Sequence, residues 1–145
     1  MPVPRPVAAA YVREGLFYTC DLITRRLPDT RTLTTLLGRG EMKEGLWREV
    51  GRVTRQFHAH GVYHPDLNAH NILIDADSHA YLIDFDRARR RKPGRWQSGN
   101  LSRLKRSLLK VCPESDLGSL AAGWRAIEAG YAAEKGRKPT MEYDR

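Results

Sequence analysis

One polar stretch between short apolar strands constrains this chain more than any other feature. It begins at His64 as His-Pro-Asp-Leu-Asn-Ala-His-Asn-Ile-Leu-Ile-Asp, and after a polar turn Leu-Ile-Asp-Phe-Asp follows, ending at Asp86. Asp66 and Asn71 share one loop, and a tight hairpin after it would return Asp84 to the side of Asn71. The sequence therefore predicts one amide and two carboxylates around a common point.

These three groups suit phosphoryl transfer. Mg²⁺ prefers carboxylate and amide oxygens, so Asn71 and Asp84 are candidate metal ligands. Asp66 is placed to accept the proton of an attacking hydroxyl, and the transferred phosphoryl needs mainly positioning and neutralisation. Asp and Asn are also common turn residues. That plain interpretation serves for any one of the three, but poorly for all three at this spacing.

The remaining pattern predicts an α+β fold with a mostly helical body and few, local strands. Leu46, Val50, Val53 and Phe57 recur at spacings of four and three, as on one face of a helix over 42–60. The other expected elements are strands at 7–12, 16–24, 72–75 and 80–83, a short helix ended by Gly38, and two helices ended near Pro113 and Gly136.

Basic residues are concentrated in one segment. The chain has 25 Lys and Arg against 17 Asp and Glu, a net charge of +8, and ten of the basic residues but no acid lie between Arg87 and Lys110. Such a patch implies an anionic partner, either a phosphate group, a nucleic acid or an acidic membrane surface. Because no recognised nucleic-acid-binding pattern accompanies it, we expect no nucleic acid partner.

All five histidines lie between His58 and His79. Their spacing fits no standard zinc pattern, and no cysteine joins them. We expect His58 and His60 to face solvent on the helix, and His64 to be buried and hydrogen-bonded.

The loop His-x-Asp-Leu-x-x-x-x-Asn followed by Ile-Asp-Phe resembles the catalytic loop and metal-binding motif of the protein-kinase-like fold. Within that superfamily the chain is similar to the 3-deoxy-D-manno-octulosonic acid (Kdo) kinases of lipopolysaccharide core synthesis. The segments that carry this likeness are 15–24, 61–73, 82–87, 95–97 and 100–104. The resemblance implies ATP-dependent phosphorylation of a Kdo hydroxyl, by family precedent the 4-hydroxyl, on a lipid A precursor. It also implies a peripheral location at the cytoplasmic face of the bacterial inner membrane.

The resemblance also assigns roles to residues. Asp66 matches the catalytic base, Asn71 and Asp84 match the ligands of Mg²⁺ and so of its ATP, and His64 and Asn68 support the loop. The segment Asp21, Leu22 and Ile23 resembles the stretch where adenine would sit. We expect the anionic acceptor or a membrane surface to meet six basic residues: Arg87, Arg89, Arg90, Arg91, Lys92 and Arg95.

The expected organisation is the end of an N-lobe and an interlobe segment at 1–28, a kinase-like C-lobe at 29–140, and a tail at 141–145. Pro65 and Asp86 stand where protein kinases have arginine and glycine, so protein-kinase-type switching is not expected. No lysine precedes Lys43, and no strand leads into a glycine-rich phosphate loop. The chain therefore resembles an N-terminally truncated Kdo kinase.

Two other functions fit the same sequence. One is a catalytically inactive, kinase-like fragment that binds anionic lipid or a partner. The other is a kinase that phosphorylates another sugar or a small alcohol.

Overall fold

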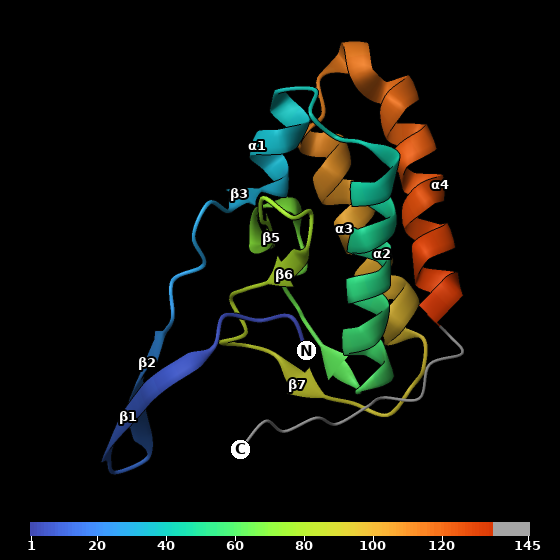
Figure 1. Ribbon diagram of the computed structural model, residues 1–145. Coiled ribbons are helices and arrows are strands. Elements are labelled where there is room, and N and C mark those ends of the chain that lie inside the picture. The colour runs from blue at the N-terminus through green and yellow to red at the C-terminus, as the bar shows by residue number, and fades with distance from the viewer. Residues whose placement is uncertain (135–145) are drawn as a thin grey trace.

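The computed structural model describes residues 1–134, so the expected tail at 141–145 lies outside the described residues. Within the described residues, four α-helices and seven strands follow one another (Figure 1). The strands are β1 (Pro6–Glu14), β2 (Phe17–Thr24), β3 (Arg31–Thr32), β4 (Val62–Tyr63), β5 (Ile72–Ile74), β6 (Ala80–Leu82) and β7 (Arg89–Arg90). The helices are α1 (Leu33–Gly38), α2 (Glu44–Ala59), α3 (Trp96–Val111) and α4 (Leu117–Ala133), with 3₁₀ turns at Ala69–Asn71 and Glu114–Asp116. The mixed α+β class is confirmed.

Helix α2 lies at the centre of the helical body, beside α4 (Figure 1). All four residues of its predicted apolar stripe are buried. The two helices approach closely because glycines face the partner backbone. A Cβ on Gly51 would lie 2.0 Å from the carbonyl oxygen of Ile127, and one on Gly130 would lie 2.0 Å from that of Arg48. The α2–α4 contact therefore requires glycine at both positions.

The predicted hairpin after the polar loop is present. Strands β5 and β6 pair antiparallel, with Ile72 opposite Leu82 and Ile74 opposite Ala80, and all four side chains are buried. Strand β3 completes this sheet beside β5, and β4 pairs separately with β7. Neither β3, β4 nor β7 was predicted, because two residues are too few to show a hydrophobic period.

Strands β1 and β2 form the predicted long hairpin, with a glycine turn between them. Figure 1 shows this hairpin extending away from the helices. All of its strand residues are exposed, including large apolar side chains such as Phe17 and Ile23. The pairing is therefore formed without a buried face.

The histidine prediction was wrong for His58, whose side chain is only 1% exposed. Helices α3 and α4 both supply contacts to it, so the buried face of α2 is wider than the stripe of four apolar residues. His60 is half-buried, and the expected burial of His64 is confirmed.

Among residues 1–134, none of the helices combines the length and the apolar character that crossing a membrane requires.

Candidate active site

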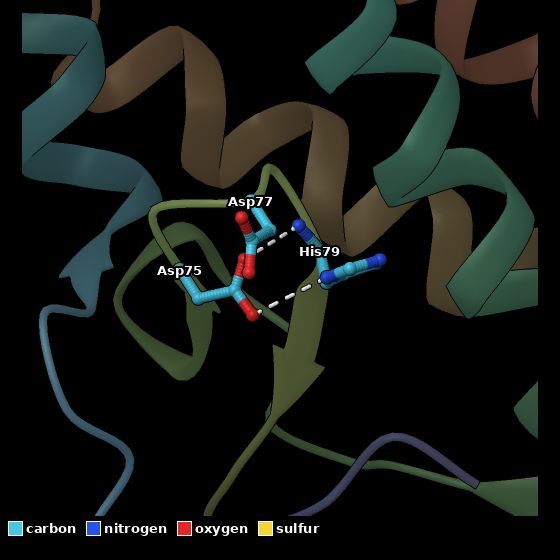
Figure 2. Close-up of side chains that lie close together, drawn as sticks. All are labelled: Asp75, Asp77 and His79. Carbon is cyan, nitrogen blue, oxygen red and sulfur yellow. Dashed lines mark hydrogen bonds and ion pairs between the residues drawn. The ribbon is translucent and has the colours of Figure 1, made fainter.

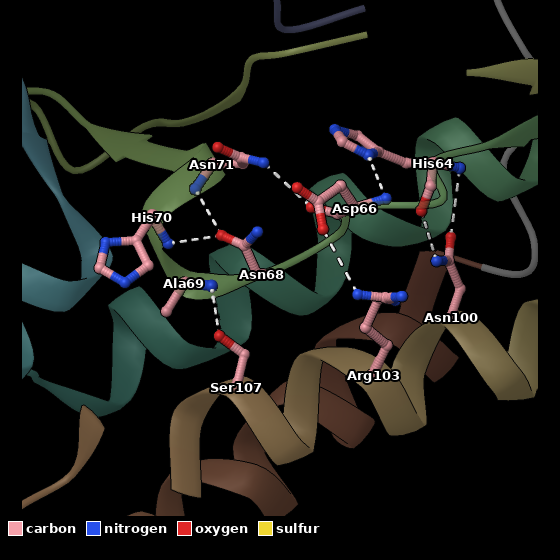
Figure 3. A network of polar contacts seen from close by, with 9 residues as sticks. All are labelled: His64, Asp66, Asn68, Ala69, His70, Asn71, Asn100, Arg103 and Ser107. Carbon is pink, nitrogen blue, oxygen red and sulfur yellow. Dashed lines mark hydrogen bonds and ion pairs between the residues drawn. The ribbon is translucent and has the colours of Figure 1, made fainter. Parts of the chain in front are cut away.

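The polar loop is shaped by its own side chains (Figure 3). Asn68 caps the short 3₁₀ turn, since its Oδ1 accepts from the backbone N–H of His70 at 2.9 Å and of Asn71 at 3.1 Å. The Asn71 amide donates through Nδ2 to the main-chain carbonyl of Asp66, at 3.0 Å. These bonds hold Asp66 and Asn71 at opposite ends of one compact turn. The amide nitrogen of Asn71 faces Asp66, and its amide oxygen points away from Asp66 (Figure 3).

His64 supports the loop through both nitrogens of its ring. Its Nδ1 accepts from the backbone N–H of Asp66 at 3.2 Å, and its Nε2 lies 2.9 Å from the carbonyl oxygen of Ile83. The two contacts fix one tautomer, because the Asp66 N–H requires an acceptor and the carbonyl requires a donor. The ring also lies 4.8 Å from that of Phe85, which stacks on Phe57 of α2 at 5.3 Å. His64 thus ties the loop to the segment that carries Asp84.

Asp84 lies directly after the bond that closes the hairpin, in which the Ile83 N–H donates to the Asn71 carbonyl at 3.1 Å. Its φ is +67°, in the left-handed region that non-glycine residues rarely occupy. Such strain persists only where surrounding contacts hold it, as the packed Phe85 ring does here. The structure therefore places the main chain that carries Asp84 beside Asn71, and the grouping of the three side chains around one point stays a prediction.

Helix α3 supplies a second support that we did not predict. Asn100, 3% exposed, donates from Nδ2 to the main-chain carbonyl of His64 at 2.6 Å. About two helical turns further on, the Ser107 hydroxyl accepts from the Ala69 N–H at 3.0 Å. Both ends of the loop are therefore held from α3 (Figure 3).

A sequence signal for Asn100 existed. The buried residues Leu104 and Leu108 follow it at spacings of four, so Asn100 occupies an apolar position of the α3 stripe. A polar residue on a buried helix face must find hydrogen-bond partners. That pattern indicates a structural polar contact.

A buried polar layer extends from Asn100 to α4. His58 donates through Nε2 to Asn100 Oδ1 at 3.2 Å, and the Tyr131 hydroxyl donates to its Nδ1 at 2.7 Å. Burial lowers the pKa of His58 to about 4, outweighing the hydrogen bond to Asn100, and the nearby Arg55 cation lowers it further. His58 is therefore neutral at physiological pH, which is the state that this bonding pattern requires.

The other predicted residues lie elsewhere. Asp21, Leu22 and Ile23 are exposed on β2 of the extended hairpin, so the structure does not bring them to the loop, and their adenine-binding role stays a prediction. The six basic residues from Arg87 to Arg95 are all exposed. Strand β7 places two of them beside β4, with Arg89 opposite Tyr63, immediately before the loop. The Arg91 guanidinium also lies over the Tyr63 ring, 4.7 Å from its centroid.

A second acidic cluster, Asp75, Asp77 and His79, lies in the turn between β5 and β6 (Figure 2). Asp75 Oδ1 accepts from the His79 N–H at 2.8 Å, and Oδ2 accepts from the Tyr81 hydroxyl at 3.0 Å. Although partial burial opposes it, these bonds lower the pKa of Asp75. Its polar contacts are those of a turn, so we interpret the cluster as structural.

The loop and the hairpin after it follow the order that the kinase-like class predicts, with Asp66 and Asn71 on the hydrogen-bonded loop and Asp84 directly after the hairpin. Comparison with known families makes the class specific. Residues 1–131 match the model of the lipopolysaccharide kinase (Kdo/WaaP) family, and the chain belongs to that family.

Curated relatives agree. The chain is 51% identical over 115 residues to the 3-deoxy-D-manno-octulosonic acid kinase of Xanthomonas oryzae pv. oryzae, covering 77% of this chain and 45% of that protein. It is 41% identical over 138 residues to the enzyme of the same name from Xylella fastidiosa, covering 94% of this chain and 55% of that protein. The chain therefore spans about half the length of these relatives.

Proposed function

We propose that this chain carries the phosphoryl-transfer site of an ATP-dependent Kdo kinase. Its acceptor is a hydroxyl of Kdo on a lipid A precursor, and by the family resemblance this is the 4-hydroxyl. The observation that carries the proposal is the hydrogen-bonded loop of Asp66 and Asn71, which α3 supports, together with the hairpin bond that brings the segment of Asp84 beside Asn71.

In this proposal Asp66 accepts a hydrogen bond, and then the proton, from the attacking hydroxyl. Its carboxylate is half-exposed, which gives an acceptor access. The Asn71 amide oxygen and the Asp84 carboxylate are hard oxygen donors of the kind that Mg²⁺ takes, so the residues present fit the metal. Bound there with ATP, Mg²⁺ would neutralise charge on the phosphate groups. His64, Asn68 and Asn100 keep the three groups in position.

The basic residues from Arg87 to Arg95 support the second part of the proposal, peripheral association with an anionic membrane surface. All six are exposed, and Arg89 and Arg90 lie on β7 beside β4, the strand that leads into the loop. Each basic residue near an anionic leaflet contributes roughly 1 kcal/mol of attraction. A surface of this kind would place the site close to a lipid-borne acceptor.

Phosphate transfer from radiolabelled ATP to Kdo-lipid A tests the proposal. Asp66→Asn should reduce the rate by at least a hundredfold, roughly what the loss of one acid–base group costs. Asp84→Asn should also reduce it strongly, because it removes the charge of a proposed Mg²⁺ ligand. Both side chains are exposed, so the unfolding temperature should not change. Asp77→Asn, in the turn cluster, is the matched control and should retain the rate.

Transfer that persists in either variant contradicts the assignment. A wild-type chain that binds anionic vesicles in a salt-sensitive way, yet transfers no phosphate, would favour the non-catalytic alternative.

A further inference from the structure

Arg103 of α3 makes a polar contact with a side chain of the loop, whereas Asn100 and Ser107 bind its main chain. Its Nη1 lies 3.3 Å from Asp66 Oδ1, and Figure 3 shows the guanidinium reaching toward that carboxylate. Asn100 and Ser107, on the same face of α3, bind main-chain groups of the loop. Arg103 and Asp66 are about half-exposed, at 49% and 53%. Arg103 thus borders the site from the solvent side.

Loop stability does not account for this contact. Ion pairs between exposed side chains contribute little to the free energy of folding. The loop is already held by hydrogen bonds from His64, Asn68, Asn100 and Ser107. A guanidinium carries five N–H donors in a planar fork, and the contact with Asp66 uses the Nη1 end. The exposed remainder of the fork is available to a ligand.

The charge around Arg103 favours an anion as that ligand. Between Arg87 and Lys110 the chain has ten basic residues and no acid, and Arg103 lies within this interval. Arginine binds carboxylate groups through two parallel hydrogen bonds, which fixes the orientation of the bound molecule. An acceptor hydroxyl must come within hydrogen-bond distance of Asp66, roughly 3 Å. Any acceptor is therefore beside Arg103 when it reacts.

We propose that Arg103 binds the carboxylate of an acidic sugar while a hydroxyl of the same sugar donates to Asp66. The inference rests on the proposed function, and it assigns to Arg103 the recognition of the acceptor's carboxylate. In this arrangement the carboxylate replaces Asp66 as the main partner of the guanidinium. Arg103 thereby selects acidic over neutral sugars and orients the reacting hydroxyl.

Binding measured by ¹H–¹⁵N NMR tests this without requiring turnover. The 145-residue chain is titrated with free Kdo, with the neutral methyl ester of Kdo, and with N-acetylglucosamine 1-phosphate. Wild type should bind Kdo at least tenfold more tightly than the ester. Arg103→Gln should remove that difference, and Arg103→Lys should keep only part of it because it retains the charge without the fork. Arg106→Gln, an exposed arginine of the same helix, is the matched control and should behave as wild type.

Three outcomes would overturn the inference. Equal weakening of Kdo and its ester in Arg103→Gln would mean that Arg103 acts only by positioning Asp66. A loss confined to the sugar phosphate would assign Arg103 to a phosphate group of the lipid. Absence of Kdo binding by the wild-type chain would also refute it. The proposed function is judged separately, by the transfer assay with the Asp66 and Asp84 variants, so the two failures can be told apart.

Discussion

The hairpins β1–β2 and β5–β6 contrast in length and in burial. The β1–β2 hairpin pairs strands of nine and eight residues, yet all of its strand side chains are exposed. The β5–β6 hairpin pairs only three residues with three, and two side chains of each strand are buried. The longer pairing follows from local sequence alone. The shorter one depends on α2 and β3, which pack against it, and it is the one that positions the candidate site.

The sharpest way to break this comparison is to truncate one isoleucine in each hairpin. Ile72 of β5 is 0% exposed and Ile23 of β2 is 61% exposed. Ile72→Ala should lower the free energy of unfolding by about 2–5 kcal/mol, because it removes buried surface and leaves a cavity. Ile23→Ala should change it by less than about 0.5 kcal/mol. Urea unfolding followed by circular dichroism measures both, and equal losses would refute the difference in burial.

The second test uses pH, because β1–β2 contains no histidine whereas the helical body buries His58. The pKa of His58 is lowered from 6.5 to about 4 in the folded chain. Between these values the unfolded chain binds a proton that the folded chain excludes. The stability that His58 contributes is therefore complete above pH 6.5 and is lost as the pH falls toward 4, by about 3 kcal/mol in total.

Urea unfolding between pH 7 and pH 4 measures this loss, and His58→Gln should flatten the profile. Hydrogen exchange should show that acid opens α2 and α3 more than it changes β1–β2. If the free energy of unfolding of His58→Gln falls with pH as steeply as that of wild type, His58 is not the cause of the loss.

Much of the fold and site could be predicted from the sequence. The periods of α2 and of the long strands, and the loop with its returning hairpin, are local patterns. The supports of the loop are not. Asn100 and Ser107 lie 36 and 38 residues from the groups they bind, and β3, β4 and β7 form only where distant segments meet. His58 was misplaced for the same reason, since its burial depends on two helices that follow it in sequence.

Close helix packing gives a third test, of intermediate size. Gly130→Ala should lower the free energy of unfolding by about 1–3 kcal/mol, because its Cβ would lie 2.0 Å from the Arg48 carbonyl oxygen and force α2 and α4 apart. Gly118→Ala, in the same helix, is the control. The added Cβ would meet no heavy atom within 4 Å. The substitution should therefore raise the free energy of unfolding by roughly 0.5–1 kcal/mol, because alanine has a better helix propensity than glycine. Destabilisation by both variants would point to a general effect of substitution in α4 and not to the α2–α4 contact.

The smallest effect on stability should come from the tip of the exposed hairpin. Leu16, 93% exposed, follows the glycine turn and precedes the exposed Phe17 and Tyr18. Leu16→Ser should leave the free energy of unfolding within about 0.5 kcal/mol of wild type, since no buried contact is lost. Exposed apolar strands with free edges favour self-association. The variant should therefore reduce the fraction of oligomer, which a lower average sedimentation coefficient would show. A loss of more than about 1 kcal/mol would show that the hairpin is covered in solution, and the contrast between the two hairpins would then fail.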